Sequence, residues 1–191
     1  MVMEESDIAA VARARDGDDE AFRILVERHS RSVFRLAYRL TGSEQDSEDL
    51  VQETFLRAFR NLKTFECRAN FSTWLFRIAV NCTVDWARRR REHFELNDEV
   101  ENMAVGPDGI PLNERRSGSD DLIRRVDMRQ TVRSTLQELS PLERAAFVLR
   151  HYEGMSIEEI SSALNVASSA AKHSIFRAVR KMRRALEPLV S

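Results

Sequence analysis

The chain has 191 residues, of which 42% are hydrophobic and 32% charged, the composition of a globular protein with one medium or two small domains. Its 30 Lys and Arg nearly balance 31 Asp and Glu, so bulk charge neither favours nor excludes a nucleic-acid partner. The two cysteines lack the spacing of a metal site, which predicts reduced thiols and no metal site. The sequence shows no leader and no apolar run of about eighteen residues, which predicts a cytoplasmic protein without membrane insertion.

Residues 16–92 predict a first helical domain. Apolar residues recur at helical spacing from Phe22 to Leu40, and Gly42 is a natural helix end. A second helix is expected to begin between Ser43 and Asp46, and a third to span 71–91. No segment alternates at period two, so we expect three or four helices and no strands.

The helix at 71–91 predicts two faces with different roles. The face from Leu75 to Trp86 is apolar and should be buried. A neighbouring face carries an aromatic, an amide and charged groups: Trp74, Arg77, Asn81, Asp85 and Arg88. Such groups stack on bases, contact base edges and neutralise phosphates, which favours nucleic acid as a partner. The alternative is a core tryptophan and a solvated, arginine-rich helix end.

Residues 93–122 have the composition of a linker. They hold three of the six glycines and two of the four prolines, among many acids. We expect a flexible acidic linker that lets two domains lie well apart.

Residues 123–188 predict a second helical domain. Ser140 and Ser156 each begin a capping box, closed by Glu143 and Glu159, and a longer basic helix follows a break after residue 164. A short helix, a tight turn and a longer basic helix form the helix-turn-helix pattern. A helical hairpin with a basic second helix and no DNA-binding role remains the alternative.

Three stretches, in this order and spacing, resemble the extracytoplasmic-function (ECF) group of bacterial RNA polymerase sigma factors. They are SEDLVQETFLRAF (47–59), FSTWLFRIAVNCTVDWARRRR (71–91) and LSPLERAAFVLRHYEGMSIEEIS (139–161). The resemblance implies an all-α chain of two small domains. Residues 16–92 would form a sigma region 2-like bundle that recognises and melts the minus-10 promoter element. Residues 123–188 would form a sigma region 4-like helix-turn-helix that reads the minus-35 element as duplex DNA.

The resemblance also assigns site residues. It implies that Asp49, Gln52 and Glu53 bind core polymerase. The beta-prime clamp and the beta flap of the polymerase would be the partners of the chain. It implies that the minus-10 element is recognised by Lys63, Phe65, Asn70, Trp74, Arg77, Asn81 and Arg88. It implies that the minus-35 element is recognised by Ser169, Lys172, His173, Phe176 and Arg177. Residues 170–174 depart from the family's Thr-Val-Lys-Ser-Arg, so the promoter sequence does not transfer from relatives.

A non-catalytic sigma subunit without a cofactor or small-molecule substrate is therefore the leading hypothesis, and the resemblance makes an anti-sigma partner plausible. A stand-alone helix-turn-helix repressor or activator is the alternative, although it leaves the face at 49–53 and the helix at 71–91 without a role. A DNA-processing enzyme such as a recombinase would need a nucleophile or paired metal-ligating carboxylates, and the sequence offers no such constellation.

Overall fold

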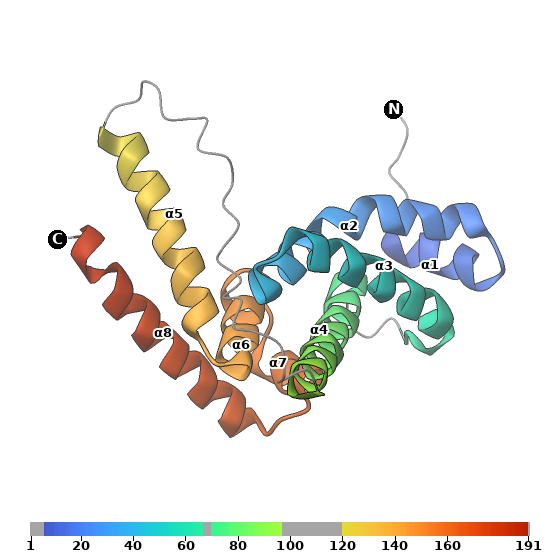
Figure 1. The fold of residues 1–191 in the computed structure, drawn as a ribbon. Coiled ribbons are helices and arrows are strands. Elements are labelled where there is room, and N and C mark those ends of the chain that lie inside the picture. Colours follow the sequence, from blue (N-terminus) through green and yellow to red (C-terminus); the bar gives the residue numbers. More distant parts are fainter. Residues whose placement is uncertain (1–5, 67–69, 97–119, 191) are drawn as a thin grey trace.

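The computed structural model describes residues 6–66, 70–96 and 120–190, and every regular element in these ranges is a helix (Figure 1). The first domain holds α1 (Asp7–Arg15), α2 (Asp19–Thr41), α3 (Glu44–Asn61), the 3-10 turn η1 (Leu62–Thr64) and α4 (Phe71–Leu96). The second holds α5 (Asp120–Glu138), α6 (Pro141–His151), α7 (Ile157–Leu164) and α8 (Ser168–Val190). The all-α prediction is confirmed, whereas most of the predicted linker and Cys67 lie outside the described residues.

The corner between α2 and α3 forms where the sequence predicted it. Gly42 ends α2 in the left-handed conformation, with φ of 78°, and its N–H donates to the carbonyl of Tyr38. Ser43 caps α3 by accepting a hydrogen bond from the backbone N–H of Asp46. With so short a link, α2 and α3 pack against each other along one side of the domain.

Helix α4 crosses this pair and is buried over a wider arc than its predicted apolar face. Leu75 is fully buried, as predicted, but Phe76 and Val80 are 7% and 1% exposed. The reason is that α4 packs against α2, α3 and also α7 of the second domain. Within the described residues, no helix is long and apolar enough to cross a membrane.

Helix α1 was not predicted. It begins at the Ser6 cap and packs on α2 through Ala10 and Val11, both fully buried. Asp7 pairs with Arg28 of α2. Nine alanine-rich residues give too short and too weak an apolar stripe to be recognised from sequence alone.

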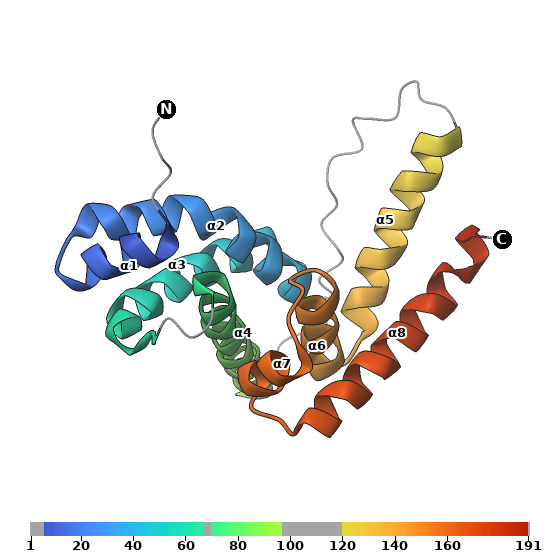
Figure 2. The ribbon, with the colours of Figure 1, turned by 180° about the vertical axis from the view of Figure 1, so that it is seen from behind.

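The second domain has the predicted helix-turn-helix. Both capping boxes are formed, at Ser140 for α6 and at Ser156 for α7. Asn165 ends α7 with φ of 51°, in the left-handed conformation that asparagine tolerates. Helix α8 then runs beside α5, which Figures 1 and 2 show from opposite sides.

The two domains lie against each other in this structure, although a linker of the predicted length would also let them lie apart. Arg144 of α6 donates from Nη1 to the carbonyl of Leu40 at 2.6 Å and from Nη2 to the carbonyl of Gln137 at 2.6 Å. Arg133 of α5 donates to the carbonyl of Gly42 at 3.2 Å. The carbonyls of Leu40 and Gly42 lie at the end of α2, where they have no partner inside the helix, so two arginines of the second domain satisfy them.

Candidate protein and nucleic-acid interfaces

The polar face predicted on α3 is present. Asp49 and Gln52 are exposed, and Glu53 lies one turn from Asp49, partly exposed. Arg57 donates from Nε to Glu53 at 2.6 Å and from Nη1 to Asp85 of α4 at 2.7 Å. These two carboxylates raise the pKa of the Arg57 guanidinium. Arg57 therefore ties the α3 face to α4, and its contact with Asp85, 28 residues away, could not be identified from sequence spacing.

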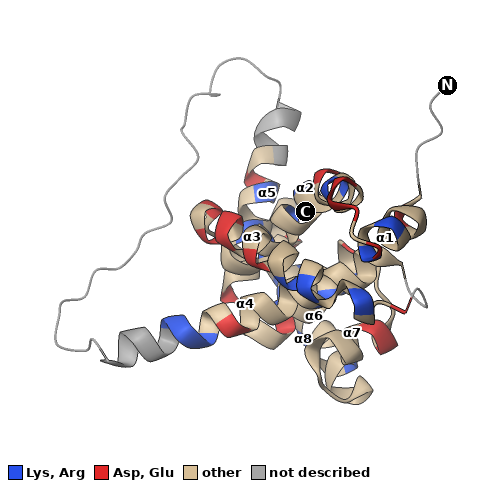
Figure 3. Ribbon diagram, turned by 90° about the vertical axis from the view of Figure 1, so that its right-hand side faces the viewer, with Lys and Arg blue, Asp and Glu red and all other residues tan. Residues whose placement is uncertain are grey.

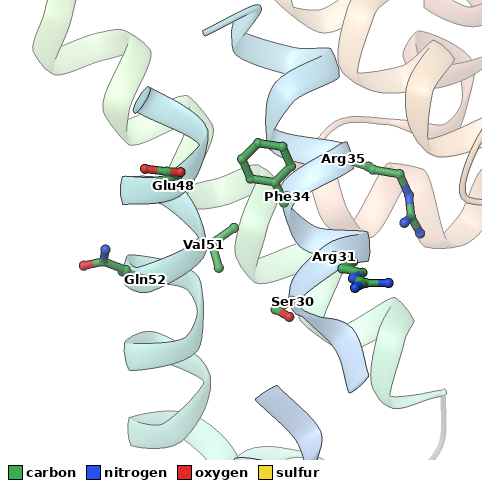
Figure 4. A pocket seen from close by; sticks show the side chains of 7 residues that line it. All are labelled: Ser30, Arg31, Phe34, Arg35, Glu48, Val51 and Gln52. Atoms are coloured by element: carbon green, nitrogen blue, oxygen red, sulfur yellow. The ribbon is translucent and has the colours of Figure 1, made fainter. Parts of the chain in front are cut away.

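A groove of about 480 Å³ adjoins this face, between α2 and α3 (Figure 4). Phe34 of α2 and Val51 of α3 point toward each other across it. The remaining lining residues are polar, namely Ser30, Arg31 and Arg35 on α2 and Glu48 and Gln52 on α3. An apolar floor between a basic and an acidic edge suits a protein partner.

The outward face of α4 brings together three predicted minus-10 residues. Arg77 and Asn81 are exposed, and Trp74 is half-buried. All three line a cavity of about 860 Å³ that α7 closes from the other side. The α7 side is formed by Met155, Glu158, Glu159 and Ser162. The predicted DNA face of the first domain therefore faces the second domain in this structure.

Phe65, which follows η1, lines the same cavity but is almost entirely buried. It is 3% exposed, and its ring packs edge-on against Phe71 at 5.7 Å and tilted against Trp74 at 5.3 Å between centroids. Phe65 therefore supports the Trp74 ring and presents only a small part of its own surface to the cavity. Lys63, within η1, and Asn70, directly before α4, are both exposed. Residues 67–69 between them lie outside the described ranges.

Residues 88–90 of α4, the last whose side chains the structure describes, form a basic stretch that Figure 3 shows in blue. Arg88, Arg89 and Arg90 are exposed. Arg90 donates to Asp46 of α3 at 3.2 Å and stacks over Trp86, 5.2 Å from the ring centroid. This end of α4 therefore combines a positive surface with a fixed position against α3.

Helix α8 presents a mixed polar and aromatic stripe. Ser169, Lys172 and His173 are exposed in its first turns. Phe176 is 67% exposed, the most exposed large hydrophobic side chain of the described residues. The exposed ring of Phe176 is therefore available for contact with a partner.

Arg177 already has a protein partner. Its Nε donates to Glu143 Oε1 at 2.9 Å, and Lys181 donates to Glu143 Oε2 at 2.7 Å. Glu143 is only 4% exposed. Burial alone would raise the pKa of its carboxyl, but hydrogen bonds from Lys181, the backbone N–H of Ser140 and Arg177 lower that pKa to about 2. Glu143 was predicted only as a helix cap.

Among the described residues, no three His, Cys, Asp or Glu side chains come together in the way a metal site would need. Cys82 is a free, buried thiol, and burial raises its pKa. It packs with Ala37 and Leu50 in the core.

Comparisons with known proteins match both domains. Residues 25–93 match the family model Sigma-70 region 2, and residues 129–182 match Sigma-70, region 4. The ECF RNA polymerase sigma-E factor of Escherichia coli K12 is 34% identical over 187 residues, covering 97% of this chain and 96% of the relative. The ECF sigma-E factor of Haemophilus influenzae is 32% identical and covers 100% of both chains. This chain belongs to the ECF RNA polymerase sigma factors.

The sigma factor is therefore a non-catalytic subunit that directs RNA polymerase to promoters. The alternatives of a stand-alone repressor or activator and of a DNA-processing enzyme are wrong. Among solved structures, CnrH in complex with the cytosolic domain of CnrY is similar, with 28% identity and a TM-score of 0.65 over 96% of this chain and 99% of CnrH.

Proposed function

We propose that the sigma factor holds core polymerase and promoter DNA on different faces of its first domain. The observation that carries this proposal is the separation of the two faces. Asp49 and Gln52 point outward from α3 beside the groove, whereas Trp74, Arg77 and Asn81 share the outward face of α4. Two separate faces would let one domain bind polymerase and open DNA at the same time.

The α4 face would recognise the minus-10 element in separated strands. Extruding a base costs a few kcal/mol, which a rigid stacking surface can offset. Trp74 is such a surface because Phe65 and Phe71 pack against its ring. Arg77 and Asn81 follow along the helix and would contact phosphates and base edges. Lys63, Asn70 and Arg88 would extend the contact at its edges.

Helix α8 would read the minus-35 element in the major groove. The first residues of a recognition helix contact base edges, and here these are Ser169, Lys172 and His173. The exposed ring of Phe176 suits the methyl group of a thymine. Arg177 lies beside this stripe, but its hydrogen bond to Glu143 holds it away from the bases that the stripe would read.

Binding both elements would require the two domains to separate. Elements centred at minus 10 and minus 35 are about 25 base pairs apart, or about 85 Å along the duplex. In the structure, α7 instead closes the cavity that contains Trp74, Arg77 and Asn81. The closed arrangement is therefore a form that DNA and polymerase would have to open.

An anti-sigma factor is a further proposed partner. The similar protein CnrH forms a complex with the cytosolic domain of CnrY. The groove between α2 and α3 is exposed, with an apolar floor and charged edges, and would offer such a partner a surface that overlaps the proposed polymerase site.

Run-off transcription tests the proposal as a whole. The purified chain, added to core polymerase from the same bacterium and a library of promoter fragments, should give transcripts that core polymerase alone does not give. Sequencing the transcribed fragments should recover two elements at a constant spacing. Enrichment of one element alone would contradict the two-domain reading of the promoter.

Reversing the charge of the α3 face is expected to weaken polymerase binding at least tenfold. Asp49→Lys with Glu53→Lys places two like charges against any basic partner surface, which costs several kcal/mol across an interface. The fold should survive, because neither side chain is buried. The measurement is the affinity for core polymerase by fluorescence titration. As a control, Asp16→Lys with Glu44→Lys makes the same change in net charge off this face. If both double variants bind equally, the docking face is wrongly assigned.

A further inference from the structure

Two cations of the recognition helix are bound to one buried carboxylate. Glu143 of α6 is 4% exposed and accepts hydrogen bonds from Arg177 at 2.9 Å and Lys181 at 2.7 Å, one turn apart on α8. The backbone N–H of Ser140 donates to the same carboxylate at 3.2 Å. The contact therefore joins α6 to the recognition helix α8 through charge-assisted hydrogen bonds.

The position of these cations around α8 separates them from the proposed reading stripe. At 100° per residue, Arg177 lies about 100° and Lys181 about 140° around the helix from Phe176. Lys172, Arg180 and Arg183 lie within about 45° of Phe176 on the same projection and are exposed. Helix α8 thus has one basic side that faces solvent and another that faces α6.

A cation that neutralises a DNA phosphate has to leave its internal partner. If Arg177 and Lys181 turned toward phosphates, Glu143 would stay buried as an unpaired charge, which is strongly unfavourable. Both side chains are about half exposed, at 53% and 50%, so Glu143 holds groups that could otherwise reach outward. Their charge is consequently withdrawn from the electrostatic attraction that drives non-specific DNA binding.

We propose that Glu143 is a specificity-determining residue, which raises the selectivity of α8 for its promoter element by keeping Arg177 and Lys181 away from DNA phosphates. This inference rests on the proposed reading of the minus-35 element by α8. Phosphate contacts carry almost all non-specific affinity, whereas base contacts discriminate between sequences. Removing two phosphate contacts therefore lowers non-specific binding while Lys172 and Phe176 continue to read bases.

The test is the salt dependence of binding to a random-sequence duplex of 30 base pairs, measured by fluorescence anisotropy with the full chain. Glu143→Gln keeps a side chain that can close the capping box but removes the charge. We expect random-duplex affinity to rise about tenfold near 0.1 M salt, and the slope of log K against log salt to steepen by one to two, about 0.9 per phosphate contact. A slope equal to that of the wild type overturns the inference.

Glu159→Gln is the matched control. Glu159 closes the second capping box, with Ser156, at the same position of α7. The substitution makes the same change in net charge, so an equal effect of Glu159→Gln and Glu143→Gln would show that net charge alone is responsible. We expect Glu159→Gln to change random-duplex affinity less than twofold.

A second pair of variants keeps the inference testable if Glu143→Gln does not fold. Lys181→Gln should leave the salt slope unchanged, whereas Arg183→Gln, on the solvent-facing side, should reduce it by about one. Equal reductions by the two variants overturn the inference. If Lys172→Ala, Phe176→Ala and Arg183→Gln all leave DNA binding unchanged, the proposed reading by α8 itself fails, which is a different result.

Discussion

Arg144→Met is expected to lower the free energy of unfolding by about 3 kcal/mol. Arg144 donates to Leu40, Gln137 and Leu139 carbonyls and to the Gln137 side chain, joining the end of α2 to the turn between α5 and α6. Methionine fills similar space but has no N–H group to donate. Each carbonyl that stays buried without a donor costs about 1–3 kcal/mol of stability. Burial lowers the pKa of the Arg144 guanidinium, because the charged group is removed from water. Methionine carries no such desolvation cost, which offsets part of the loss of stability.

Arg133→Met is the comparison for Arg144→Met, because it removes a contact between the domains and leaves the hydrogen bonds of Arg144 in place. Arg133 contributes one hydrogen bond to the Gly42 carbonyl and stacks 4.8 Å from the centroid of the Tyr38 ring. Its loss should cost less than about 1 kcal/mol, the usual size of a partly exposed cation–π contact. Urea unfolding of both variants, followed by circular dichroism, gives the comparison. Equal midpoints for Arg144→Met and Arg133→Met would show that Arg144 is not the main connection.

The helix boundaries were predictable because their signals are local. Gly42 ends α2 where a left-handed residue is needed, and Ser43 caps α3 three residues before its hydrogen-bond partner. The boxes at Ser140 and Ser156 fixed the starts of α6 and α7 in the same way. Each signal acts within one turn of helix, so it can be read without knowing the fold.

The contacts that control the interfaces were not predictable, because they join residues far apart in sequence. Arg144 lies 104 residues from Leu40, and Arg177 lies 34 residues from Glu143. Helical periodicity gives the side of a helix on which a residue lies, but not the element that packs there. Phe65 shows the same limit, since its burial depends on Phe71 of the next helix.

Gly42 combines both kinds of constraint. Its positive φ is a local requirement that the sequence pattern revealed. The second domain adds another, because a Cβ at this position would lie 2.9 Å from the Gln137 side-chain nitrogen. Only the packed structure reveals the second constraint, so a glycine recognised as a helix end is also a point of close approach between domains.

Trp74→Ala is expected to impair promoter opening more than it impairs folding. Trp74 is half-buried against Phe65 and Phe71, so truncation should cost roughly 2 kcal/mol of stability, less than the 3–5 kcal/mol of a fully buried tryptophan. The aromatic contacts of Trp74 are the reason that some loss of stability is expected. Loss of base stacking should also make strand separation about 1–3 kcal/mol less favourable, which is a change on the order of tenfold or more in its equilibrium constant.

Ile78→Ala is the matched control for Trp74→Ala. Ile78 lies one turn along α4, lines the same cavity and packs against the same core, but has no aromatic surface. Both variants should melt at lower temperature, whereas only Trp74→Ala should lose permanganate reactivity of promoter thymines. A premelted bubble template should then restore transcription by Trp74→Ala, because it supplies the open strands that the variant fails to form. Equal loss of opening in both variants would assign the defect to stability, and normal opening by Trp74→Ala would exclude a stacking role.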